Sequence, residues 1–215
     1  MIATMPSFKV VVAGDGGVGK TALVNYLADG GFVREYVPTL GATVMPLEVS
    51  TTRGSVHLSL WDIAGQKRYA GLSDAYYIMA NAALVCYAES DQASFHAVPK
   101  WVAGIRNVCE DIPLLILRLK ADSASVWRDG NGGRCAPTEA LVANTQEAID
   151  ALGVPEFKVS GMSRPDIAAV LVNLLRELTG DDTLELVKKF HPRLSSRFEL
   201  RCPWVKAIGP EGDRR

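Results

Sequence analysis

Residues 14–21 read GDGGVGKT, which fits the phosphate-binding pattern of G, any four residues, G, K and then S or T. An apolar run (Phe8–Ala13) precedes it and a helical pattern (Thr21–Asp29) follows, which is the context such a loop requires. The glycines allow successive backbone N–H groups to point at phosphate oxygens. Lys20 would neutralise the β- and γ-phosphates, and the Thr21 hydroxyl would ligate Mg²⁺. The stretch predicts a nucleotide phosphate site made of Gly14, Asp15, Gly16, Gly17, Val18, Gly19, Lys20, Thr21 and Ala22.

Residues 61–66, WDIAGQ, supply groups that cleavage of a γ-phosphate needs. Asp62 ends a predicted strand, where its carboxylate can hold Mg²⁺ through water. Gly65 can offer its N–H to the γ-phosphate, and Gln66 can orient an attacking water. We therefore predict that Gln66 and Lys20 are catalytic, the alternative being an ordinary turn from strand to loop.

Residues 35–42, EYVPTLGA, form the loop before a predicted hairpin. Taken alone, a Thr after a Pro is usually a turn residue. Because the loop lies next to the hairpin that carries Asp62, Thr39 can reach both Mg²⁺ and the γ-phosphate. The predicted metal ligands are Thr21, Thr39 and Asp62.

Strand and helix patterns alternate along the rest of the chain. Six strands are predicted at Phe8–Ala13, Thr43–Thr51, Ser55–Ile63, Ala83–Ala88, Leu114–Leu119 and 156–160. The second and third flank TTRG and predict a hairpin. Further helices are predicted at Ser94–Glu110, 137–152 and 164–178. The expected fold is α/β, with a six-stranded, mainly parallel sheet, one antiparallel edge hairpin and helices on both faces.

Composition narrows the class of protein. The chain has 215 residues, of which 48% are hydrophobic, and a formal charge of −1, so neither direct nucleic-acid binding nor attraction to a membrane surface is expected. Its four cysteines show no CxxC pair, which favours free thiols in a reducing compartment. The N-terminal residues lack a signal-peptide pattern, and Cys202 is too far from the end for prenylation, so no membrane anchor is expected.

Together these motifs resemble the Ras superfamily of small GTPases over residues 8–178, and within it the nuclear-transport branch, Ran. The Ran-like segments include YVPTLGATVMPLEV, TTRG, GLSDAYYI and NVCEDIP. The resemblance implies a P-loop small-GTPase domain at residues 1–178 and a C-terminal extension at 179–215. It also implies binding of GTP and GDP with Mg²⁺, and nucleotide contacts from Phe32 and Tyr36.

The same resemblance implies partners and a place in the cell. Importin-type transport receptors, an exchange factor and an activating protein would be the partners, and the protein would be found in nucleus and cytoplasm. No arginine is placed by the sequence to complete the site in cis, so hydrolysis is expected to be slow without a partner's arginine.

Residues 113–122, PLLILRLKAD, raise the question of base recognition. In the resembled family this strand end carries Asn-Lys-x-Asp, but here Leu119 replaces the Asn while Lys120 and Asp122 are present. The surviving half distinguishes guanine from adenine, although Lys120 and Asp122 can also be interpreted as a solvated strand end. Loss of the Asn side chain should cost about 1–3 kcal/mol, or roughly 10- to 100-fold in affinity.

The second base-contacting loop of the family, Ser-Ala-Lys, matches SGM at residues 160–162. Ser160 and Gly161 remain as nucleotide contacts, since Gly161 can donate its N–H to guanine O6. Met162, in contrast, supplies no charged stem.

Other segments depart further from the resembled branch. Residues 123–137 form a longer, glycine-containing connection that is expected to be a loop. The helix predicted to end at 152 has no Lys or Arg, and the chain ends in GDRR where Ran has an acidic cluster, so the tail switch is expected to be absent or rebuilt. Leu184, Val187 and Phe190 have helical spacing and predict a short docked helix before an irregular tail; a partner-binding role is the alternative.

The sequence thus favours a Ran-like GTP-binding protein with Mg²⁺-dependent hydrolysis. Two hypotheses remain beside it. Leu119 and Met162 favour a pseudo-GTPase that serves as an interaction module. An NTPase with relaxed base choice is disfavoured by Asp122.

Overall fold

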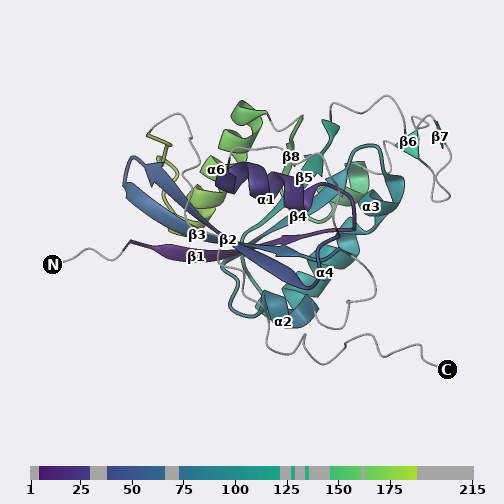
Figure 1. Ribbon diagram of the computed structural model, residues 1–215, viewed down its shortest axis with the longest axis horizontal. Helices are drawn as coiled ribbons and strands as arrows, with labels where there is room; N and C mark the ends of the chain where they lie inside the picture. Colours follow the sequence, from purple (N-terminus) through teal and green to yellow (C-terminus); the bar gives the residue numbers. More distant parts are fainter. Residues whose placement is uncertain are drawn as a thin grey trace, which may run out of the picture.

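A computed structural model describes residues 5–29, 38–65, 73–121, 127–128, 134–135, 146–160 and 163–187. A six-stranded sheet in the order β2-β3-β1-β4-β5-β8 runs through its centre (Figure 1). Its strands are β1 (Ser7–Ala13), β2 (Ala42–Thr51), β3 (Gly54–Ile63), β4 (Ala82–Ala88), β5 (Leu114–Leu119) and β8 (Glu156–Lys158). The helices are α1 (Lys20–Asp29), α2 (Ser73–Tyr77), α3 (Gln92–His96), α4 (Val98–Cys109) and α6 (Arg164–Thr179), and residues 146–150 are also helical.

The sheet has the predicted topology. β1 pairs in parallel with β3 and β4, and β5 pairs in parallel with β4 and β8. Only β2 runs antiparallel, forming the edge hairpin with β3. All seven residues of β4 are buried, as expected for a continuous apolar run covered on both faces. The predicted α/β fold with a six-stranded, mainly parallel sheet is confirmed.

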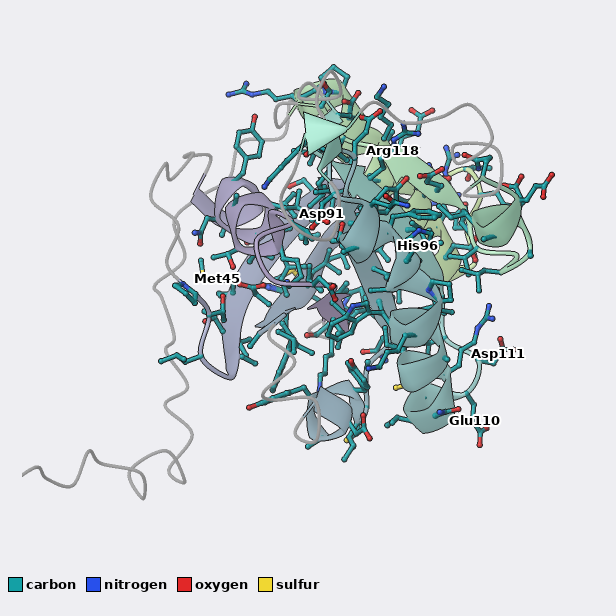
Figure 2. The ribbon with its side chains drawn as sticks, turned by 90° about the vertical axis from the view of Figure 1, so that its right-hand side faces the viewer. Met45, Asp91, His96, Glu110, Asp111 and Arg118 are labelled. Carbon is teal, nitrogen blue, oxygen red and sulfur yellow. The ribbon has the colours of Figure 1, made fainter. Side chains whose placement is uncertain are left out.

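Two apolar cores cover the faces of the sheet. One contains side chains of α1 and α6, and the other contains side chains of α2, α3 and α4. Figure 1 shows α1 and α6 on one side of the sheet and α2 and α4 on the other. In Figure 2, Asp91 and Arg118 lie at one end of the molecule, and Glu110 and Asp111 lie at the opposite end. The first end is the carboxyl edge of the parallel strands, where α/β proteins bind ligands.

The single helix predicted at Ser94–Glu110 is wrong, because two helices meet at Ala97. Pro99 lacks an N–H and is tolerated in a first helical turn but not in a helix interior. α3 instead begins at an N-cap, Asp91, whose carboxylate accepts the N–H groups of Ala93 and Ser94. The five-residue helix α2 was also not predicted from the sequence.

Residues 123–137 are not entirely a loop. Backbone pairing joins β6 (Trp127–Arg128) to β7 (Arg134–Cys135) in a separate antiparallel pair. The sequence between them, DGNGG, contains the glycines that a hairpin connection favours, so the expectation of a plain loop is wrong for the four residues of β6 and β7.

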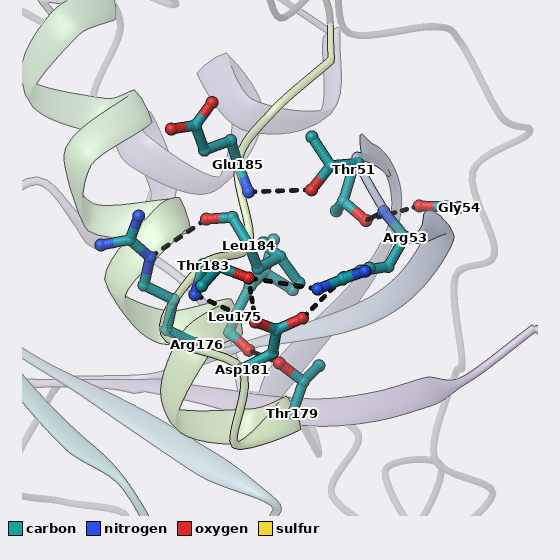
Figure 3. A network of polar contacts seen from close by, with 11 residues as sticks. Thr51, Arg53, Gly54, Leu175, Arg176, Thr179, Asp181, Thr183, Leu184 and Glu185 are labelled. Atoms are coloured by element: carbon teal, nitrogen blue, oxygen red, sulfur yellow. Dashed lines mark hydrogen bonds and ion pairs between the residues drawn. The ribbon is translucent and has the colours of Figure 1, made fainter.

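The helix predicted at 184–190 is also wrong over its described part. After a turn closed by the Leu184 N–H and the Asp181 carbonyl, residues 185–187 run along the β2–β3 hairpin (Figure 3), where Leu186 forms a bridge with Thr51. The Val187 N–H donates to the Ser50 carbonyl at 3.1 Å, and Leu184 is buried in the core beneath. The edge strand β2 offers unpaired backbone N–H and C=O groups, and hydrogen bonds to these groups stabilise the pairing more than one further helical turn would stabilise a helix. Phe190 lies outside the described residues, and the domain boundary at 178 stays a prediction.

We call residues 181–187 the strap. Its first residue, Asp181, accepts a hydrogen bond from Arg53 Nε at 2.7 Å, and the Thr52 N–H donates to the Glu185 carbonyl at 2.9 Å. The strap therefore fastens the chain after α6 to the tip of the hairpin. Within the described part of the chain, no helix has the length and apolar character needed to cross a membrane.

Candidate functional site

The glycine-rich loop between β1 and α1 has the conformation of a phosphate cradle. Gly14 has φ of 136°, and Gly19 has φ of 115°, both in a region that side chains rarely adopt. A β-carbon at Gly14 would also collide with the Cys86 carbonyl oxygen of β4. Only glycine therefore fits at Gly14. The loop leads directly into α1, whose first-turn N–H groups favour anions.

Lys20 lies folded over this loop. Its Nζ donates to the carbonyl oxygens of Gly14 and Asp15, each at 2.8 Å, and the residue is only 5% exposed. An ammonium group has three donors, so one is left for a phosphate oxygen. Burial lowers the pKa of Lys20 from its usual value. Bound phosphate would oppose this shift by supplying a negative partner. The remaining loop residues follow the same path, with Val18 buried in the core and Ala22 in the first turn of α1.

The three predicted metal ligands meet at the end of β3. The Thr21 hydroxyl donates to Asp62 Oδ2 at 2.6 Å, and the Thr39 hydroxyl lies 3.3 Å from the same oxygen. The two hydroxyl oxygens are 3.0 Å apart. They come from α1, from the segment before β2 and from β3, so the fold brings together residues that are distant in the sequence.

The chemistry of this cluster fits Mg²⁺. Asp62 is 1% exposed, and its Oδ1 has no hydrogen-bond partner. Burial raises the pKa of Asp62, and the Thr21 and Thr39 hydroxyls and the charge of Lys20 oppose this shift only in part. Hydroxyl and carboxylate oxygens are the ligands that hard cations prefer. The described residues contain no group of three or more His, Cys, Asp or Glu able to hold a metal, so phosphate oxygens and waters would complete the coordination.

Gly65 packs directly on the phosphate loop. A β-carbon added there would lie 2.5 Å from both the Gly14 carbonyl oxygen and the Gly16 nitrogen. These neighbours are backbone atoms, which cannot swing aside as a side chain could. The strand end after Asp62 is therefore in contact with the loop, as a group that senses a γ-phosphate must be. The predicted catalytic residue Gln66 lies outside the described residues.

The end of β5, where the sequence predicts the base-recognition residues, also contacts the phosphate loop. Lys120 Nζ donates to the Gly17 carbonyl at 2.7 Å, so its stem crosses the loop. Leu119 is 0% exposed, and a β-carbon at Gly19 would lie 3.5 Å from its Cδ1. The residue that replaces the family's Asn thus fills apolar space between the strand and the loop. Lys120 is exposed and bonded to the phosphate loop, and its contact with a base stays a prediction.

Ser160 is another predicted nucleotide contact. The Ser160 N–H donates to Asp166 Oδ2 at 3.0 Å, and its carbonyl accepts the Ser163 N–H at 2.7 Å, so Ser160 anchors the start of α6. The other predicted contacts with the base or nucleotide lie outside the described residues: Phe32, Tyr36, Asp122 and Gly161.

Two contacts at this end of the sheet were not predicted from the sequence. The Trp101 indole N–H donates to Asp15 Oδ1 at 2.8 Å, across 86 positions of sequence. On the opposite face of β5 from Leu119, Arg118 (labelled in Figure 2) lies at the strand end. Its guanidinium donates to Glu89, which fixes the strand end. A tryptophan on a helix carries no local signal of such a role. The charge of Arg118 inside an apolar strand was the one visible hint.

These features define a P-loop nucleotide-binding protein. They are a glycine-rich loop at a helix N-terminus, a lysine folded over that loop, and three side-chain oxygens that meet near the end of β3. Residues 9–180 match the family model described as the Ras family. The chain belongs to the Ras family and is a small GTP-binding protein. Its sheet, with one antiparallel edge pair, agrees with that membership.

Proposed function

We propose that this chain is a Ran-like GTPase whose two loops are held by GTP and Mg²⁺ and released after hydrolysis, and that it serves nucleocytoplasmic transport. One observation supports the switch most directly. Thr39, from the segment before β2, and Asp62, at the end of β3, both reach the Thr21 hydroxyl at the start of α1. Bound Mg²⁺ would neutralise charge between phosphates and these oxygens, and loss of the γ-phosphate would free the Thr39 segment.

The groups around the phosphate site each have a defined role in this proposal. Lys20 and the loop N–H groups stabilise charge on the phosphates. Gln66 orients the attacking water, and Gly65 reports the γ-phosphate because it already contacts the loop.

Four arginines in the described part of the chain have hydrogen-bond partners outside the phosphate loop. Arg53 bonds Asp181, Arg106 the Leu152 carbonyl, and Arg176 the Leu184 carbonyl. Arg118 bonds Glu89. None of these four is directed at the phosphate loop. From the family resemblance we propose slow intrinsic hydrolysis and an activating protein that supplies an arginine.

The Ran-like assignment depends on sequence segments. GLSDAYYI contributes helix α2, and NVCEDIP connects α4 to β5. From this likeness we propose importin-type receptors and an exchange factor as partners, with residence in nucleus and cytoplasm. A direct test is capture of the full chain by a purified importin-type receptor. Binding that strongly favours the GTP-loaded form over the GDP-loaded form supports the role, and equal or no binding contradicts it.

A pseudo-GTPase is the second candidate, and buried Leu119 favours it. An apolar side chain at 0% exposure cannot make the base contact that an Asn makes. Thr21, Thr39 and Asp62 argue the other way, because an inert scaffold gains nothing from bringing two hydroxyls to one oxygen of a buried carboxylate whose other oxygen has no partner.

Nucleotide content and turnover separate the two candidates. The purified protein is denatured, the released nucleotide is identified by chromatography, and single-turnover hydrolysis of GTP is followed with Mg²⁺. Gln66→Leu should abolish turnover while keeping GTP bound, and Thr21→Asn should weaken GTP binding in the presence of Mg²⁺. Gln92→Leu, an equivalent change on the surface of α3, is the matched control.

The turnover results distinguish the GTPase from the pseudo-GTPase. GTP that binds but never turns over, with or without an activating protein, favours the pseudo-GTPase. Turnover that is unchanged in Gln66→Leu contradicts the assigned role of that residue.

A further inference from the structure

Asp15 places a carboxylate inside the phosphate-binding loop, between Gly14 and Gly16. A negative charge there opposes the binding of phosphates, which are negative themselves. The negative charge of Asp15 acts on Lys20 in the same loop. Burial lowers the pKa of Lys20, and Asp15 is among the groups that oppose this shift. Tight phosphate binding therefore requires the Asp15 carboxylate to point away from the phosphates.

Trp101 provides a contact that draws the carboxylate away. Its indole N–H donates to Asp15 Oδ1 at 2.8 Å. Trp101 lies in the first turn of α4, where its backbone N–H bonds the Ala97 carbonyl at 3.1 Å and its ring packs on the core beneath that helix. α4 covers one face of the sheet, whereas α1, whose N-terminus receives the phosphates, covers the other. The hydrogen bond thus directs the charge to the α4 side.

The backbone of Asp15 is fixed independently of this contact. Lys20 Nζ donates to its carbonyl at 2.8 Å. Gly65 packs against its peptide group so closely that no β-carbon fits between them. The rotation of the Asp15 side chain is what remains to be set, and Trp101 sets it.

We propose that Trp101 is a positioning residue of the phosphate site, whose indole N–H holds the Asp15 carboxylate away from the β- and γ-phosphates of bound nucleotide. The proposal rests on nucleotide binding and is independent of the transport role. It predicts an effect that grows with the phosphate charge of the ligand, because the interaction it removes is repulsion between charges.

A double-mutant cycle on the full chain tests this. Trp101→Phe keeps a ring and removes the donor, Asp15→Asn removes the charge, and the double variant does both. Affinities for GMP, GDP and GTP are measured with Mg²⁺ at low and high salt, and thermal unfolding checks the fold of each variant. Trp61→Phe is the control, because Trp61 is a partly buried tryptophan whose ring contacts Lys9, at 4.0 Å, on β1.

Loss of a hydrogen bond to a charged group should lower GTP affinity about tenfold in Trp101→Phe. GDP should lose less, GMP should change by less than about twofold, and high salt should shrink the loss. Asp15→Asn should bind GTP at least as tightly as wild type, and adding Trp101→Phe to it should change affinity by less than about twofold. Trp61→Phe should bind as wild type does.

Equal losses for all three nucleotides, or losses that remain in the Asp15→Asn background, overturn the proposal and leave Trp101 a packing residue. If Trp101→Phe does not fold, the benzothienyl analogue of tryptophan at position 101 removes the N–H without changing the shape. If the analogue loses affinity most for GTP, less for GDP and hardly at all for GMP, the proposal is supported. If it binds all three nucleotides as wild type does, the proposal is refuted. A wild-type chain that binds no GTP would overturn both this inference and the proposed function.

Discussion

Replacement of Leu119 by Asn separates stability from nucleotide affinity. Leu119 is fully buried between β5 and the phosphate loop, so removing its side chain sacrifices about 1.5–3 kcal/mol of apolar burial. An amide left there without a partner costs about 1–3 kcal/mol more. Without nucleotide, Leu119→Asn should therefore lower the free energy of unfolding by roughly 2.5–6 kcal/mol.

Bound purine should reverse part of this loss. If the amide reaches N7 of the base, as in the resembled family, the bond should return about 1–3 kcal/mol, or roughly 10- to 100-fold in affinity. N7 is present in both guanine and adenine. GTP and ATP should therefore both bind more tightly, while the ratio between them changes little.

The assay is urea unfolding of the nucleotide-free protein combined with competition binding of GTP and ATP. Leu117→Asn is the matched control, since Leu117 is also 0% exposed and faces the same core two residues earlier in β5. The control should lose stability without gaining affinity. If Leu119→Asn loses stability and its GTP affinity stays at the wild-type value or falls, position 119 has no contact with the base.

Three further changes test other parts of the structure. Gly65→Ala should abolish tight GTP binding, because its β-carbon meets backbone atoms of the phosphate loop; unchanged binding in a titration would show that the contact opens freely. Leu184→Ala should cost about 2–5 kcal/mol in urea unfolding and exposed Val187→Ala less than about 0.5, whereas equal small losses would favour a folded unit ending near 178. Hydrogen bonds from Thr183 and Arg53 lower the pKa of Asp181, so its stabilisation is present above the usual carboxyl pKa and disappears as pH falls through the lowered value. The stability difference between wild type and Asp181→Asn should therefore shrink as the pH falls below about 4, and a constant difference would contradict this.

Local patterns were enough to predict much of this protein. The phosphate loop could be recognised because its glycines, lysine and threonine act through the backbone of one continuous segment. The hairpin at Thr43–Ile63 and the buried strands followed from the two-residue period of β-structure and from unbroken apolar runs. Thr39 and Asp62 could be singled out because Thr39 lies just before the predicted hairpin and Asp62 lies near the end of its second strand.

Other features depend on which segments the fold brings together. The Trp101 contact with Asp15 spans 86 positions, and the strap's ion pair between Arg53 and Asp181 spans 128. Helical spacing suggested a helix for the strap residues, but the edge of β2 offered backbone partners that spacing does not reveal. A tryptophan or aspartate becomes a partner only through the position of another segment in space. Sequence periodicity records which face of an element is apolar, whereas hydrogen bonds between distant side chains depend on how those faces are packed.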